Sequence, residues 1–398
     1  MLSRKARALK PSPTLTIAAK AKELAAEGHK VISLSVGEPD WDTFATIKEA
    51  GIRALQAGQT KYAPSNGTPE LRTAIAKKTS ALLGVTYKPT EVTVSVGAKF
   101  ILFGALQMLC DPGDEVLIPA PYWVSYPTMV ELVDGVPVIV NSDETIGFKV
   151  RAVDIEKKLT AKSKILLLNS PNNPSGQVYT RTEIEDLVGL LRRHPHLVVI
   201  SDDIYNQLIF TDEKVAAHIL QVAPDLKERV IVVNGASKTY SMTGWRIGWA
   251  LGPENVIKAM SNYQSQTVSC ASPFTQTAVL AGLNAGDGEV EANVRTLIRR
   301  RDTFVEGLNQ VKGWHANPPQ GAFYVWADVR KLFGRSLRGH RLSTSAEVAE
   351  ALLIDQKVAV VPGGESGVEG YLRLSFALHE SDLAEAVRRI RAFTESLT

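Results

Sequence analysis

The chain has 398 residues, with 44% hydrophobic and 22% charged side chains, and these fractions are typical of a globular protein. They exclude disordered, collagen-like and disulfide-scaffold classes. The 45 Lys and Arg against 42 Asp and Glu give a formal net charge of +3, which is too small over this length to indicate binding to nucleic acid or to a membrane. We expect two joined domains, since a domain usually has roughly 100 to 200 residues.

The N-terminal segment is basic, and its first acidic residue is Glu23. This pattern also occurs in transit peptides, but a continuous apolar region of the secretory type is missing. Cys110 and Cys270 each lack a C-x-x-C neighbour, so we expect reduced thiols. No apolar run approaches the roughly 20 residues that a membrane span needs. We therefore expect a cytoplasmic protein.

From about residue 90, short β-branched runs alternate with helical periodicity, which is the pattern of a parallel sheet covered on both faces. The clearest helical signal is the capping box of Thr180 and Glu183. The predicted strands span 92–96, 115–119, 136–140, 165–169, 197–201, 230–234 and 247–251. The sequence thus predicts an α/β fold with one seven-stranded, mostly parallel sheet.

After about residue 285 the pattern changes to a long amphipathic helix, with apolar residues at helical spacing from Val290 to Val311. Shorter strands are predicted at 322–326, 358–361 and 371–376, followed by a closing helix. We expect a large domain over 46–284 and a smaller α+β domain made of 1–45 and 285–398.

Polar residues follow the ends of the predicted strands, and ligands bind at that edge of a doubly wound sheet. These residues are Gly97, Ala98 and Lys99, then Tyr122 and Trp123, then Asn173, then Asp202, Asp203 and Tyr205, and finally Ser237, Lys238 and Arg246. An amine, a carboxylate, an amide, a guanidinium and a helix start should therefore meet at one site. The seven histidines show no metal-binding spacing, so we expect no metal.

In this order the motifs resemble those of the class I aminotransferases, which are pyridoxal phosphate enzymes of fold type I. Within them the chain is most similar to the bacterial aspartate and prephenate aminotransferase subgroup. The resemblance covers nearly the whole chain through segments 10–12 (KPS), 36–40 (VGEPD), 61–62 (KY), 121–127 (PYWVSYP), 173–174 (NP), 237–238 (SK) and 371–375 (YLRLS). It implies pyridoxal 5'-phosphate as the cofactor.

The resemblance also implies the catalytic roles. Lys238 would bind the cofactor aldehyde and shuttle a proton, and burial should lower its pKa. Asp202 would hold the proton on the pyridine nitrogen, and Asp203 would be a helix cap or a supporting residue. Tyr205 and Asn173 would hydrogen-bond the phenolate oxygen of the cofactor.

The remaining cofactor contacts follow from the same resemblance. The helix that opens at Gly97 would offer the N–H groups of Ala98 and Lys99 to the phosphate. The phosphate would also contact Ser237, Arg246 and, from the neighbouring subunit, Tyr62, while Trp123 would stack on the ring. A site shared in this way requires a homodimer.

For the substrate, the resemblance makes Arg373 the clamp on the α-carboxylate, with Gly37, Asn173 and Trp123 beside it. Lys99, helped by Ser12 and Thr14, would bind the distal carboxylate of aspartate or glutamate. The expected reaction is transamination between an acidic amino acid and a 2-oxo acid. Phe100, Ala98 and the 376–379 ending depart from the family pattern, so an aromatic, prephenate or kynurenine aminotransferase and a β-lyase of the same fold stay open as alternatives.

Overall fold

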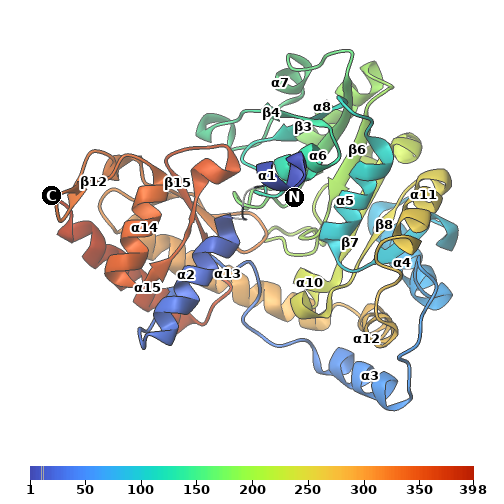
Figure 1. The fold of residues 1–398 in the computed structure, drawn as a ribbon, viewed down its shortest axis with the longest axis horizontal. Helices are drawn as coiled ribbons and strands as arrows, with labels where there is room; N and C mark the ends of the chain where they lie inside the picture. Colours follow the sequence, from blue (N-terminus) through green and yellow to red (C-terminus); the bar gives the residue numbers. More distant parts are fainter. Residues whose placement is uncertain (10, 12) are drawn as a thin grey trace.

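The computed structural model describes residues 1–9, 11 and 13–398, and its main element is a seven-stranded sheet (Figure 1). The strands are β2 (Val92–Ser95), β3 (Glu115–Pro119), β4 (Val136–Val140), β5 (Ser163–Asn169), β6 (Val198–Asp202), β7 (Val230–Gly235) and β8 (Gly248–Leu251). Their order is β2-β8-β7-β6-β5-β3-β4, and only β8 runs antiparallel to its neighbours within this sheet. The predicted mostly parallel sheet is confirmed.

Helices cover both faces of this sheet (Figure 1). They are α3 (Ala45–Gln56), α4 (Pro69–Leu83), α5 (Ala98–Leu109), α6 (Tyr126–Leu132), α7 (Ala152–Glu156), α8 (Arg181–Arg193), α9 (Ile219–Val222), α10 (Ala236–Thr239), α11 (Glu254–Ser265) and α12 (Pro273–Asn284). Alternate residues of β5 enter different apolar clusters: Ile165 and Leu167 pack on one face, and Leu166 and Leu168 on the other. This two-sided burial explains why the strands are apolar throughout.

A smaller antiparallel sheet, in the order β14-β15-β10-β9, forms the other part of the molecule. Its strands are β9 (His315–Ala316), β10 (Tyr324–Asp328), β14 (Val361–Pro362) and β15 (Tyr371–Ser375), and two short ladders pair β1 (Ile32–Ser33) with β13 (Val358–Ala359) and β11 (Ser336–Leu337) with β12 (His340–Arg341). The accompanying helices are α2 (Pro13–Ala26), α13 (Gly288–Asn309), α14 (Ser345–Gln356) and α15 (Glu380–Ser396). The predicted long helix is therefore present as α13.

The N-terminal helices lie on different parts of the molecule (Figure 1). Helix α1 (Arg4–Ala8) lies beside α6, where Lys5 Nζ donates to the carbonyl oxygen of Leu132 and to Asp134. Helix α2 packs against β13 and β14 of the smaller part. No helix within the described residues is both long and apolar enough to cross a membrane.

Candidate active site

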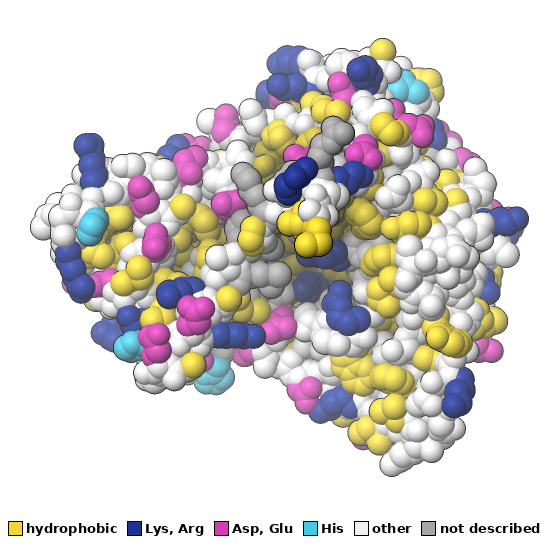
Figure 2. Space-filling view, in the orientation of Figure 1, with side chains coloured by type: hydrophobic (Ala, Val, Ile, Leu, Met, Phe, Trp, Pro, Cys, Tyr) yellow, Lys and Arg dark blue, Asp and Glu magenta, His cyan; other side chains and the backbone are white. Residues whose placement is uncertain are grey.

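A cavity of about 370 Å³ opens at the carboxyl ends of β5, β6 and β7, bordered on its other side by β10 and β15. Figure 2 shows a recess with Lys and Arg side chains near the middle of the molecule. Eleven of the residues predicted for the site line this cavity: Gly37, Ala98, Lys99, Trp123, Asn173, Asp202, Tyr205, Ser237, Lys238, Arg246 and Arg373. Segments far apart in the sequence thus meet at one place, as expected for the edge of a doubly wound sheet.

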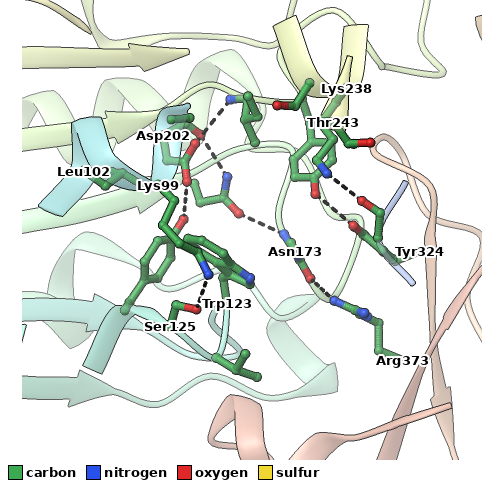
Figure 3. A pocket seen from close by; sticks show the side chains of 18 of the residues that line it. Lys99, Leu102, Trp123, Ser125, Asn173, Asp202, Lys238, Thr243, Tyr324 and Arg373 are labelled. Carbon is green, nitrogen blue, oxygen red and sulfur yellow. Dashed lines mark hydrogen bonds between the residues drawn. The ribbon is translucent and has the colours of Figure 1, made fainter. Parts of the chain in front are cut away.

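Lys238 lies in the short helix α10, directly after β7, and points into the cavity (Figure 3). Its Nζ donates a hydrogen bond of 2.5 Å to the carbonyl oxygen of Gly37. Burial lowers the pKa of Lys238 to about 8, although the nearby Glu38 carboxylate opposes this shift. A useful fraction of the side chain is therefore a neutral, nucleophilic amine close to neutral pH.

Asp202 ends β6 and faces the same cavity, with only 4% of the residue exposed. Its Oδ2 accepts a 2.6 Å hydrogen bond from the Tyr126 hydroxyl, and its Oδ1 accepts from the N–H of Ile204. Burial raises the pKa of Asp202 to about 6, while these two donors act to lower it. The carboxyl group is thus mainly ionised at pH 7, inside an environment that favours a cationic partner.

Tyr126 and Tyr324 also line the cavity, and sequence reasoning did not select them. Tyr126 opens α6 and packs edge-on against Trp123, with ring centroids 5.4 Å apart. The Tyr324 hydroxyl lies 2.8 Å from the Tyr205 hydroxyl. Tyr126 belongs to the PYWVSYP segment and could have been chosen on that ground, but buried tyrosines in strands such as β10 are usually core residues.

Arg373 reaches the cavity from β15 and is buried, with 3% of the residue exposed. Its Nη1 donates to Asn173 Oδ1 at 3.1 Å and its Nη2 to the carbonyl oxygen of Ser35 at 2.6 Å, whereas Nε has no partner. Its guanidinium lies 4.5 Å from the centre of the Tyr324 ring. No carboxylate of the described chain forms an ion pair with Arg373, so this buried cation is suited to an anionic ligand.

The start of α5 and the side chain of Arg246 bring N–H donors together in a second region of the site. Gly97 precedes the helix with φ +105°, and a Cβ atom there would lie 2.5 Å from Arg246 Nη2. Glycine is therefore required for the close approach of Arg246, whose Nη1 donates to the carbonyl oxygen of Thr243. The N–H groups of a helix start and a guanidinium are the usual ligands of a phosphate.

Lys99 is the second residue of α5, and its side chain lines the cavity and extends toward Ser125 at the start of α6. Its Nζ donates to Ser125 Oγ at 3.3 Å and lies 4.6 Å from the centre of the Trp123 ring. Burial, together with the charge of Arg246, lowers the pKa of Lys99. Lys99 and Ser125 also border a second cavity of about 740 Å³ between α2, α6 and α14. Lys99 therefore lines both the 370 Å³ cavity and the 740 Å³ cavity.

The other predicted site residues do not line the cavity. Gly97 lies next to it, and Tyr62 is 90% exposed on the surface of this chain. Ser12 and the side chain of Thr14 lie outside the described residues, so the structure gives no position for these two predicted contacts.

The site thus combines a buried lysine with a lowered pKa, a carboxylate and two arginines in one cavity. The chain belongs to the family of class I and II aminotransferases, whose model matches residues 29–390. It is 44% identical over 391 residues to the aspartate/prephenate aminotransferase of Cereibacter sphaeroides, covering 98% of both chains. It is 41% identical to the aspartate aminotransferase of Rhizobium meliloti over 97% of this chain and 94% of that protein.

Solved structures agree with this assignment. The crystal structure of the aspartate aminotransferase from Rhizobium meliloti matches with a TM-score of 0.96, 40% identity and full coverage of both chains. The aspartate aminotransferase from Thermus thermophilus with maleate matches with a TM-score of 0.91 and 40% identity over 99% of both chains. The chain is therefore an aminotransferase of fold type I, and enzymes of this family depend on pyridoxal phosphate.

Proposed function

We propose that the 370 Å³ cavity holds pyridoxal 5'-phosphate and that the enzyme transfers the amino group of an acidic amino acid to a 2-oxo acid. The observation that carries this proposal is the presence, in one buried cavity, of Lys238 with a lowered pKa, of the carboxylate Asp202, and of Arg373, whose Nε has no hydrogen-bond partner. An aldehyde is complementary to the Lys238 amine, a basic ring nitrogen to the Asp202 carboxylate, and an anion to the Arg373 guanidinium. The donors present therefore fit the cofactor and its substrate.

The catalytic roles follow from the positions of these side chains. When bound, pyridoxal phosphate supplies a ring that accepts the electron pair left at Cα when the amino acid loses its proton. Lys238 binds the aldehyde and then moves that proton as a general base and acid, for which a pKa of about 8 is suitable. Ionised Asp202 holds a proton at the ring nitrogen. Tyr205 and Asn173 donate to the ring oxygen, and Trp123 covers one face of the ring.

The phosphate is bound at the start of α5. Arg246 and Ser237 supply side-chain donors, and Ala98 and Lys99 supply N–H groups that the first helical turn leaves without intrahelical partners. Tyr62 completes the phosphate site in a second copy of the chain, in line with its 90% exposure here. The proposal therefore includes a homodimer with shared active sites.

Substrate recognition is proposed for two cations that line the cavity from different elements, Arg373 of β15 and Lys99 of α5. Arg373 binds the α-carboxylate, and Lys99 binds the distal carboxylate of aspartate or glutamate. The names of the relatives and the dicarboxylate maleate in the Thermus thermophilus structure support an acidic substrate. The name of the Cereibacter sphaeroides relative and the apolar side chains of Leu102 and Trp123 in the cavity favour prephenate or an aromatic amino acid as a second candidate.

We further propose that residues 46–284 form the cofactor domain and that 1–45 and 285–398 form the smaller domain, in a cytoplasmic enzyme. The two sheets support this division, since the strands of the large one fall within 92–251 and those of the smaller one within 315–375. The substrate site would then lie between the two domains.

Replacing Lys99 by serine tests the acidic preference. We expect kcat/KM for aspartate to fall about 10 to 200-fold, since a charge-assisted hydrogen bond contributes about 1.5 to 3 kcal/mol. Phenylalanine should lose much less, because it needs only the α-carboxylate contact of Arg373. The ratio of the two losses, measured by steady-state kinetics, cancels a general disturbance of the phosphate site.

Ser125→Ala is the matched control for this test, since it removes the hydroxyl that Lys99 contacts but leaves the ammonium in place. It should reduce aspartate turnover less than Lys99→Ser does. Equal losses for aspartate and phenylalanine in Lys99→Ser would show that Lys99 has a structural role, and the prephenate or aromatic alternative would then be preferred.

Replacing Tyr126 by phenylalanine removes the short hydrogen bond to Asp202 while retaining the packing on Trp123. The pKa of Asp202 should rise, because one of the donors that oppose its desolvation is lost. We expect about a tenfold lower kcat at pH 7 and an acidic limb of the kcat profile shifted to higher pH. An unchanged acidic limb would contradict this role.

A further inference from the structure

Two buried titratable residues, Asp203 and His218, lie near Asp202 but outside the 370 Å³ cavity. Asp203 is the next residue along the chain and is 3% exposed, and His218, just before α9, is 5% exposed. Asp203 does not line the 370 Å³ cavity, but with Asn206 it lines two separate cavities of about 10 and 20 Å³. The smaller of these, which His218 also lines, has room for roughly one water molecule.

The contacts of this pair fix which atoms face each other. Ser201 Oγ donates to Asp203 Oδ1 at 2.6 Å, whereas Asp203 Oδ2 lies 3.5 Å from His218 Nε2, and neither of these two atoms has a hydrogen-bond partner. His218 Nδ1 accepts from the N–H of Leu220 at 3.1 Å. A neutral imidazole that accepts at Nδ1 carries its proton on Nε2, so an N–H group faces the free carboxylate oxygen of Asp203.

The charge states agree with this arrangement. Burial lowers the pKa of His218 to about 4, so that the ring is neutral at pH 7. Burial raises the pKa of Asp203 to about 7, opposed by the hydrogen bond from Ser201. Asp203 is therefore close to its titration point, and a donor at Oδ2 decides whether it is ionised.

Other titratable groups near this pair are also buried. Asp202 is adjacent in the chain, and the Tyr87 hydroxyl is buried without a partner, its pKa raised by burial and by the charge of Asp203. Lys78 and Tyr240 line the 20 Å³ cavity across from Asp203, where Lys78 is already paired with Asp287. Among these groups, His218 has the ring nitrogen, Nε2, that lies 3.5 Å from Asp203 Oδ2.

We propose that His218 and Asp203 are positioning residues of the active site: the Nε2–H of His218 keeps Asp203 ionised, and that charge helps Asp202 to retain the proton it shares with the cofactor ring. This inference rests on the proposed function. A negative charge one residue away makes loss of the shared proton more costly, since it would leave a second uncompensated charge in the same buried region. The expected effect is a shift of about one pH unit in the titration of the bound cofactor.

Two substitutions of His218 separate this role from that of a helix cap. In His218→Asn, the side chain still accepts from the Leu220 N–H but no longer directs a donor at Asp203. In His218→Gln, the longer side chain directs an amide N–H at Asp203 but no longer caps α9. The measurement is the pH at which the absorbance of the bound cofactor changes. We expect it to fall by about one unit in His218→Asn and in Asp203→Asn, and by much less in His218→Gln.

The chain offers a matched control. His379 caps α15 in the same way, accepting from the N–H of Ser381 through Nδ1, but it is exposed. His379→Asn should leave the titration unchanged. If His218→Asn does not fold, Ser201→Ala removes the other donor to Asp203 and should shift the titration in the same direction.

Three outcomes would overturn the proposal: no shift in Asp203→Asn, equal shifts in His218→Asn and His218→Gln, or a shift in His379→Asn. A parent enzyme that shows no absorbance of a cofactor bound through Lys238 would instead contradict the proposed function. The two failures are therefore distinguishable.

Discussion

Replacing Lys238 by alanine should abolish transamination while the chain still folds and binds pyridoxal phosphate noncovalently. The proposed phosphate contacts of Arg246, Ser237 and the start of α5 should remain in this variant, because the Lys238 side chain forms no hydrogen bond with any of them. The loss should exceed about 10⁴-fold, since one side chain supplies both the covalent anchor and the proton transfer. Single-turnover kinetics with aspartate measure this loss.

Borohydride reduction of the parent enzyme, followed by peptide mapping, should label Lys238. In the cofactor-free protein, the rate at which Lys238 reacts with pyridoxal phosphate should rise with pH and reach half of its maximum near pH 8, because burial lowers its pKa to about 8. Lys78→Ala is a suitable control, since Lys78 is also largely buried but is paired with Asp287. Label on another lysine would refute the assignment.

Replacing Asp202 by asparagine should reduce the rate of Cα deprotonation by about 10² to 10⁴-fold. A neutral amide cannot hold the proton on the ring nitrogen. The Ile204 N–H can still donate to the amide oxygen, and the Tyr126 hydroxyl can accept from the amide NH2 group, so the fold is retained. Stopped-flow absorbance with excess aspartate gives the rate.

Asp203→Asn is the comparison variant for Asp202→Asn. We expect the rate of Cα deprotonation to fall only about tenfold in it, because Asp203 lies outside the cavity and acts on the cofactor only through its charge. A loss below tenfold in Asp202→Asn, or one no larger than in Asp203→Asn, would exclude Asp202 as the partner of the ring nitrogen.

The large sheet was predictable because its strands are buried on both faces, which leaves continuous β-branched runs such as the one in β5. The residues that follow these strands, such as Asp202 and Lys238, could therefore be placed at one edge before any coordinates were known. The role of Arg373 was implied by the resemblance of the YLRLS segment to the family, and its position in the apolar strand β15 agrees with the need of a buried cation for an anion.

The remaining contacts depend on long-range packing that no local pattern reports. Tyr324 lies inside a strand of the smaller sheet and looks like an ordinary core aromatic in sequence. Tyr126 lies in the PYWVSYP segment, but that segment gives no sign of its hydrogen bond to Asp202. The pairing of His218 with Asp203 joins two segments whose approach is set by α9 and the end of β6. Tyr62 is likewise exposed in the single chain, and the proposed dimer would bring it to the phosphate of the second copy.

The one antiparallel strand of the large sheet has a consequence for how such an enzyme can change. Because β8 returns directly beside β7, Lys238 and Arg246 lie on the same short connection between these strands, at the edge where the cavity opens. The spacing between the proposed anchors of the aldehyde and of the phosphate is then set by local chain geometry. The groups proposed to select the substrate, Arg373 and Lys99, come from β15 and α5, outside that connection. Substitutions in β15 that alter the substrate range can therefore accumulate without changing this spacing, whereas substitutions at Lys99 also fall within the proposed phosphate site.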